Sequence, residues 1–297
     1  MRRIFLFASV TLLLFPTVSY AWTLSGFESP KTMQVDPETG AYYVSNIQGE
    51  PSAKDGGGYI SKITPNGSIV IQKFIGGKAG SRLLNAPKGL WVTEKEIFAA
   101  DIDAVKVFDK ANGKLTVSID MAPWGAQDLN DLVMDNSGYL YVCDQSMNKI
   151  FKIDTQANFE VAVFREGAVL GRPNGLMINP KSKHLMAVTW EGGQILEIEP
   201  KGRIHVLKRG LHKLDGIDYD VEGNLYVSSV EKGEVYRIPF YGRGTLTIFL
   251  SGLASPANIS CDRKRHELLV PSLTGHSAST YPLIKKLERK QPPVQTK

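Results

Sequence analysis

The chain has 297 residues, which is enough for one large domain with a substantial core. Its formal net charge of +5 comes from the two ends, because Arg2 and Arg3 open the chain and a basic cluster follows residue 284. The body between them is close to neutral and has no basic stripe, so we expect no nucleic-acid partner.

The first predicted element, residues 1–21, is a cleavable secretory signal. Arg2 and Arg3 precede an apolar stretch at 4–15, which is too short to span a bilayer, and small residues Ser19 and Ala21 stand before the expected cut. The mature protein would begin at Trp22 and reach the periplasm or the medium. No later stretch is long and apolar enough for a membrane span, so we expect a soluble monomer.

A sequence motif that recurs about every forty residues accounts for most of the remaining chain. A turn precedes an apolar run, a Gly/Asn/Asp turn follows, and two further runs complete each copy. The six copies begin at Ser29, Ala86, Asp128, Arg172, Lys213 and Ser255. Repetition at this period predicts one supersecondary unit used six times.

The fifth copy shows the unit most clearly. Apolar runs at 217–220, 225–229, 234–239 and 246–250 are separated by short turns rich in glycine. Four antiparallel strands in about forty residues are typical of a propeller blade. We therefore predict an all-β, six-bladed β-propeller over residues 22–287, followed by a disordered basic tail at 288–297.

Three details complete the predicted ring. The polar, Gly-rich stretch 48–58 is an insertion in the first blade, either a flexible excursion or a rim of a pocket. The sixth copy lacks a fourth strand, which residues 22–27 could supply. Cys143 and Cys261 fall in opposite blades, too far apart for a disulfide, so we expect two free, buried thiols.

The turns before the six innermost strands should meet at one end of the channel. Equivalent positions there hold Lys31, Lys88, Asn130, Asn174, Asp215 and Ala257. Glu28 lies a few residues before the first of these strands and could reach the same place. Carboxylate and amide oxygens suit a hard divalent cation such as Ca²⁺, Mg²⁺ or Mn²⁺. Any one of these residues taken singly is better explained as a turn cap, and only their convergence indicates a metal site.

These motifs resemble the SMP-30/gluconolactonase/LRE-like superfamily of six-bladed propellers. The matching residues are Glu28-Ser-Pro, Asn130-Asp131, Asn174-Gly175 and Asp215-Gly216, in four repeats and in the family's order. The resemblance implies that Glu28, Asn174 and Asp215 hold a divalent metal, Ca²⁺ in many members, that Asn130 faces the substrate, and that Asp215 is also the general base. Lys31 and Thr32 stand where the family commonly has an aromatic residue.

The resemblance implies a metal-dependent hydrolase of a lactone or related ester, acting on a small molecule. The cation would polarise the carbonyl while a carboxylate takes a proton from water. Lys88 is a candidate for contacting an anionic group of the substrate. Two alternatives stay open: a non-catalytic NHL-like propeller that binds a protein or small ligand on its top face, and a lyase or condensing enzyme on the same scaffold.

Overall fold

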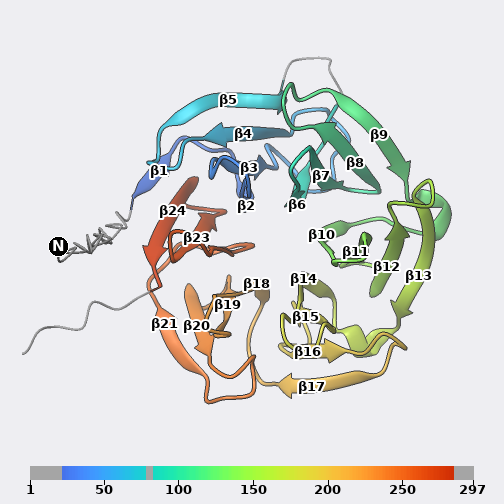
Figure 1. Cartoon of the computed structure of the whole chain (residues 1–297), viewed down its shortest axis with the longest axis vertical. Coiled ribbons are helices and arrows are strands. Elements are labelled where there is room, and N and C mark those ends of the chain that lie inside the picture. Colours follow the sequence, from blue (N-terminus) through green and yellow to red (C-terminus); the bar gives the residue numbers. More distant parts are fainter. Residues whose placement is uncertain (1–21, 78–82, 284–297) are drawn as a thin grey trace, which may run out of the picture.

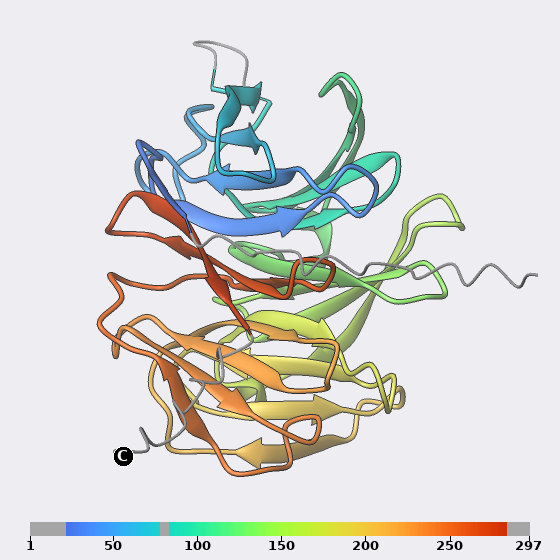
Figure 2. The same cartoon turned by 60° about the vertical axis from the view of Figure 1, so that its left-hand side comes forward.

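Six four-stranded antiparallel sheets surround a central axis, as the blades of a propeller do (Figure 1). The computed structural model describes residues 22–77 and 83–283. Turning the molecule by 60° shows the sheets stacked one against the next around the ring (Figure 2). The predicted six-bladed propeller is confirmed; the predicted signal and basic tail lie outside the described residues.

Each blade runs from an innermost to an outermost strand. Blade one has β2 (Pro30–Val35), β3 (Tyr42–Asn46), β4 (Tyr59–Ile63) and β5 (Ile69–Gly76). Blade two has β6 (Pro87–Val92), β7 (Glu96–Asp101), β8 (Ala104–Asp109) and β9 (Leu115–Asp120). Blade three has β10 (Leu129–Met134), β11 (Tyr139–Asp144), β12 (Lys149–Asp154) and β13 (Glu160–Glu166).

Blade four has β14 (Pro173–Ile178), β15 (Leu185–Thr189), β16 (Ile195–Ile198) and β17 (Ile204–Lys208). Blade five has β18 (Leu214–Tyr219), β19 (Leu225–Ser229), β20 (Glu234–Ile238) and β21 (Thr247–Leu250). Blade six has β22 (Ser260–Asp262), β23 (Glu267–Ser272), β24 (Ser277–Pro282) and β1 (Thr23–Ser25). Two 3₁₀ turns, η1 (Ala122–Trp124) and η2 (Ala168–Leu170), join blades. Within the described ranges, no helix has the length and apolar character needed to cross a membrane.

The core lies between neighbouring blades. In blade five, β18 and β19 are buried along their whole length, whereas the outer β21 is partly exposed. Phe98 and Val107 of blade two share one apolar cluster with Leu129, Leu140 and Phe151 of blade three. Because both faces of an inner strand are covered by sheets, its apolar residues pack between blades while its polar residues are also buried.

The N-terminal strand closes the ring. β1 pairs antiparallel with β24, with Thr23 opposite Ser279 and Leu24 opposite Ala278. Trp22 packs on the Tyr42 ring of blade one, 5.8 Å between ring centroids. The prediction that residues 22–27 complete blade six is confirmed, and their pairing covers an otherwise open sheet edge.

Deleting residues 22–27 should therefore destabilise the whole ring. The deletion removes the buried Phe27 side chain, the contacts of Trp22 and the pairing along β24. We expect a loss of about 3 kcal/mol or more, hence a fall in Tm of roughly 10 °C. Thermal unfolding followed by circular dichroism measures it, with deletion of 288–297 as the control. An unchanged Tm would show that β1 does not brace the ring.

The two thiols are free and buried, as predicted. The Cys143 S–H donates to the Asn174 carbonyl oxygen at 3.0 Å, and Ser45 in the first blade donates to the Lys88 carbonyl oxygen at 2.6 Å. In both cases a second strand binds the first residues of the innermost strand in the following blade. These bonds fix the turns that surround the channel.

Candidate functional site at the turn end of the channel

A β-bulge recurs at the start of five innermost strands. The regular pairing with the second strand is interrupted between Pro30 and Met33, Pro87 and Leu90, Leu129 and Leu132, Pro173 and Leu176, and Leu214 and Ile217. A bulge adds an unpaired residue and redirects side chains. The residues in these bulges include Lys31, Lys88, Asn130, Asn174 and Asp215, all of which line one cavity. The repeated bulge thus explains why equivalent turn positions converge.

Glycine after the polar residue lets neighbouring inner strands approach closely. A Cβ at Gly175 would lie 2.2 Å from the Asp215 carbonyl oxygen, and one at Gly216 would lie 2.1 Å from the Ile259 nitrogen. Gly89 stands similarly close to Asp131, at 2.7 Å. Only glycine fits such distances. The Asn-Gly and Asp-Gly pairs noted in the sequence therefore have a packing role in addition to any chemical one.

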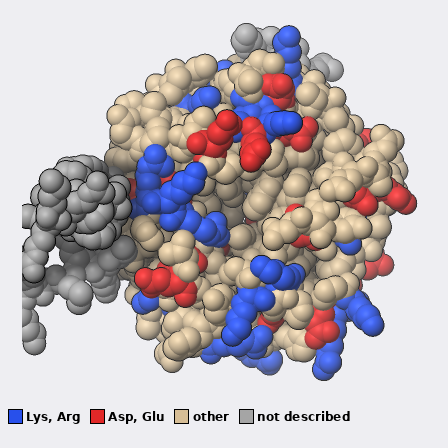
Figure 3. Space-filling view, in the orientation of Figure 1, with Lys and Arg blue, Asp and Glu red and all other residues tan. Residues whose placement is uncertain are grey.

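The cavity at this end of the channel has a volume of about 590 Å³. Pro51 and Ser52 from the 48–58 insertion line it, so the insertion forms part of the rim. Trp190 lines another side, with the Lys213 ammonium 5.3 Å from its ring centroid. Figure 3, which views one face of the molecule along the ring axis, shows charged side chains of both signs around its hollowed centre.

A lysine holds the predicted catalytic carboxylate. Lys31 Nζ lies 2.5 and 2.6 Å from the two oxygens of Asp215, and 3.4 Å from Asn174 Oδ1. All three side chains are almost fully buried. The Asn174 amide nitrogen donates to the Leu214 carbonyl oxygen at 3.1 Å, which fixes its oxygen toward the lysine. Because an ammonium has three N–H donors, these three acceptors use its whole donor capacity.

Glu28 does not join this cluster. Its side chain is exposed and does not line the cavity, and its backbone N–H donates to Asn46 Oδ1 at 3.1 Å. In the amide orientation that satisfies its neighbours, Gln48 donates to Glu28 Oε2 at 3.0 Å. Glu28 therefore contacts the insertion, away from the carboxylate it was expected to accompany.

The residues as arranged do not fit a divalent cation. Both Asp215 oxygens already contact an ammonium, and a second, doubly charged cation beside it would be repelled. Across the described ranges, no group of three or more His, Cys, Asp or Glu side chains could hold a metal ion. The predicted ligand set of Glu28, Asn174 and Asp215 is thus brought together only in part.

Lys88 and Asn130 have hydrogen-bonding capacity left over. Lys88 pairs with Asp128 Oδ1, while the other Asp128 oxygen accepts from Ser146 at 3.0 Å. Among the residues described, two of the three Lys88 donors have no partner, and buried Asn130 Oδ1 has none. Such groups on a cavity wall are suited to meet a ligand.

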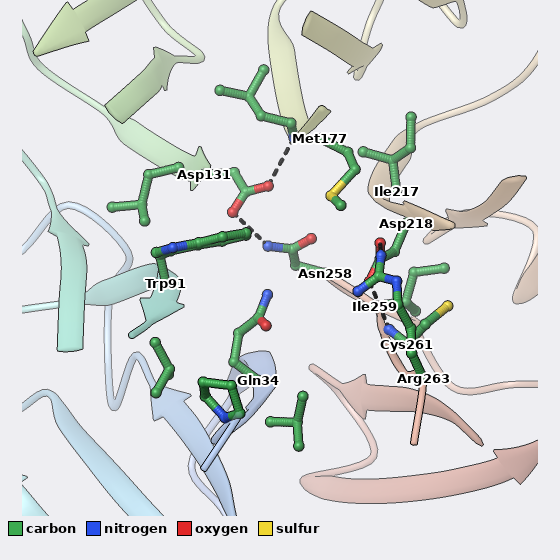
Figure 4. Close-up of a pocket in the computed structure, with 15 residues that line it drawn as sticks. Gln34, Trp91, Asp131, Met177, Ile217, Asp218, Asn258, Ile259, Cys261 and Arg263 are labelled. Atoms are coloured by element: carbon green, nitrogen blue, oxygen red, sulfur yellow. Dashed lines mark hydrogen bonds and ion pairs between the residues drawn. The ribbon is translucent and has the colours of Figure 1, made fainter. Parts of the chain in front are cut away.

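A second, smaller cavity of about 200 Å³ includes Asp131 in its wall (Figure 4). Asp131 Oδ2 accepts from the Leu176 N–H at 2.8 Å and Oδ1 accepts from Asn258 Nδ2 at 2.7 Å. Complete burial raises the pKa of this carboxyl to about 7, although these hydrogen bonds oppose the rise. Asp131 thus ties blade three to blades four and six, in agreement with the structural role expected for it.

Lys31 is a site residue that was not predicted from the sequence. It stands at the turn position shared by the other five residues, which was the available signal. Its partner, however, lies 184 residues away in blade five. The pairing across the ring follows only from ring closure.

No family model and no curated protein sequence matches the chain. Solved structures match it in fold. A catalytically inactive virginiamycin B lyase from Staphylococcus aureus with quinupristin matches with a TM-score of 0.62 and 14% identity, over 89% of this chain and 99% of that one. A structural genomics protein of unknown function from Bacteroides thetaiotaomicron gives 0.65 and 13%, over 86% and 70%. A chain of a nidogen/laminin complex gives 0.61 and 18%, over 76% and 80%. At these identities the similarity establishes the propeller fold alone.

Proposed function

We propose that the protein is a binding propeller that takes a small polar molecule into the cavity at the turn end of its channel. One observation carries this proposal: Lys31 occupies both oxygens of Asp215, the candidate base, while Lys88 and Asn130 beside it keep unused hydrogen-bonding groups. The cavity wall therefore has groups that can bind a ligand, but it has no free carboxylate at Asp215 to take a proton.

The chemistry of the wall defines the ligand class. Lys88 favours an anionic or carbonyl oxygen, Asn130 Oδ1 favours a hydroxyl or N–H donor, and the Trp190 ring supplies an apolar face. A hydroxylated carboxylic acid, or its lactone, has a carboxylate or carbonyl oxygen for Lys88, a hydroxyl group for Asn130 Oδ1 and C–H groups that can contact the Trp190 ring. The rim at Pro51 and Ser52 would contact whatever part of such a ligand faces solvent.

The second candidate is the hydrolase of a lactone or related ester. It is favoured by the convergence of Asn130, Asn174 and Asp215 on one cavity. Lyases among the structures of similar fold favour an enzyme in general rather than hydrolysis in particular. For this activity Lys31 would have to leave Asp215, because the ammonium contacts both carboxylate oxygens that would take the proton.

Thermal shift separates the two candidates. Purified residues 22–297 are screened against hydroxy acids and their lactones, alongside Lys88→Met and Asn130→Leu. We expect a ligand-dependent rise in Tm, without turnover, that is lost in both variants. Lys106→Met is the matched control, since Lys106 is a buried, paired lysine that does not line this cavity. A ligand-dependent rise in Tm that persists in both variants would show that the ligand does not bind in this cavity. Turnover of a lactone that Asp215→Asn abolishes would favour the hydrolase.

Export is part of the proposal. Removal of residues 1–21 would leave Trp22 as the first residue, and Trp22 stands immediately before β1 and packs on Tyr42. The periplasm or medium would then be the place of ligand binding. N-terminal sequencing of the protein from a cell fraction tests the cut after Ala21.

A further inference from the structure

We propose that the ammonium of Lys31 is a built-in cation, which takes the place of a divalent metal ion between Asp215 and Asn174. The inference concerns the centre of the ring and does not depend on which ligand the cavity takes.

The geometry at Lys31 is that of a coordinated cation. Its nitrogen contacts two carboxylate oxygens of blade five and one amide oxygen of blade four, at 2.5, 2.6 and 3.4 Å. The lysine itself comes from blade one, so three blades meet at one charge. These are all oxygen acceptors, the ligand type that Ca²⁺ and Mg²⁺ prefer. The ammonium neutralises Asp215 without adding any ion from solution.

Burial makes a cation at this place obligatory. Asp215 has an exposed fraction of 1%, and an isolated carboxylate so deeply buried is strongly disfavoured. A lysine, a metal ion or a proton can compensate it. In this structure Lys31 supplies the compensating charge, and its ammonium stands where a metal ion would have to bind.

Removing the ammonium should uncover a latent metal site. Asp215 would then offer two oxygens and Asn174 one, and Asn130 Oδ1 on the same cavity wall has no partner among the described residues. Water can complete the coordination that Ca²⁺ needs. Lys31→Ala frees the space, and Lys31→Glu adds a carboxylate on the strand that now supplies the ammonium.

The test is thermal unfolding of residues 22–297 with CaCl₂ or with a chelator. We expect no calcium-dependent change in Tm for the wild type, and a rise of roughly 5 °C or more for Lys31→Ala and Lys31→Glu. Lys88→Ala is the matched control, because Lys88 is buried in the same cavity and paired with Asp128, outside the cluster of Asp215 and Asn174. Its Tm should not respond to calcium.

Two results would overturn the proposal. A calcium-dependent rise in the wild type, reversed by the chelator, would show that a metal binds although Lys31 is present. Folded Lys31→Ala and Lys31→Glu proteins that do not respond to calcium would show that the lysine does not stand in a cation site. If either variant folds only when refolded with calcium, that dependence itself supports the proposal, and the wild-type measurement still decides it.

Discussion

Replacing Asp215 by alanine should lower the free energy of unfolding by about 3 to 5 kcal/mol, because Lys31 would be left buried and unpaired. The two side chains have exposed fractions of 5% and 1%. At that depth the loss of one partner costs far more than the pair contributes in net terms. Urea unfolding of the metal-free protein measures the change.

The double variant Lys31→Met/Asp215→Leu should recover most of that loss. Replacing a buried ion pair by apolar groups of similar size is often neutral or stabilising, whereas breaking it is costly. The cycle of single and double variants therefore gives the interaction free energy between Lys31 and Asp215. Asp128→Ala is the comparison, and should cost less because Asp128 is 20% exposed. If Asp215→Ala leaves the free energy of unfolding unchanged or raises it in the absence of metal, Asp215 is not paired with Lys31, and the proposed ion pair is contradicted.

The second large effect is a pH dependence of stability at Asp131. Burial raises the pKa of this carboxyl to about 7, from an ordinary value of 3.8. Between these values the unfolded chain has lost the proton while the folded protein keeps it. The contribution of this group to the free energy of unfolding is thus fully present below about pH 4. It is lost as the pH rises to about 7, and the loss amounts to about 4 kcal/mol.

Asp131→Asn should remove this pH dependence, since an amide does not titrate. The difference in unfolding free energy between wild type and variant should move in favour of the variant by about 4 kcal/mol from pH 4 to pH 8. Using the difference cancels the titration of other carboxyls. Urea titrations at several pH values give the two curves. Parallel curves would show that Asp131 is ionised in the folded protein throughout this range.

Much of the architecture could be predicted because it is local and repeated. Each copy of the repeated motif contains its own strand and turn residues, so the period of the repeat predicts six blades. The gap in the sixth copy indicated the role of β1, and the separation of Cys143 and Cys261 indicated free thiols. Each of these expectations rests on residues close in sequence or on the order of the ring.

The site was predicted less completely for a physical reason. Asn130, Asn174 and Asp215 converge because each sits in the same bulge of its blade, and the repeat reveals that equivalence. Glu28 lies before its strand, outside the bulge, so no repeated geometry directs it inward. Lys31 has the required position, but its pairing with Asp215 depends on how blades one and five are placed in the closed ring, with blade six between them.

The central claim is that Lys31 replaces a metal ion at the centre of the ring. A crystal structure of residues 22–297 grown with MnCl₂, with anomalous data, tests it most directly. We predict continuous density for the Lys31 ammonium between Asp215 and Asn174, with no anomalous peak there. A manganese peak at about 2.0–2.6 Å from the Asp215 and Asn174 oxygens, with Lys31 turned away, would contradict the account.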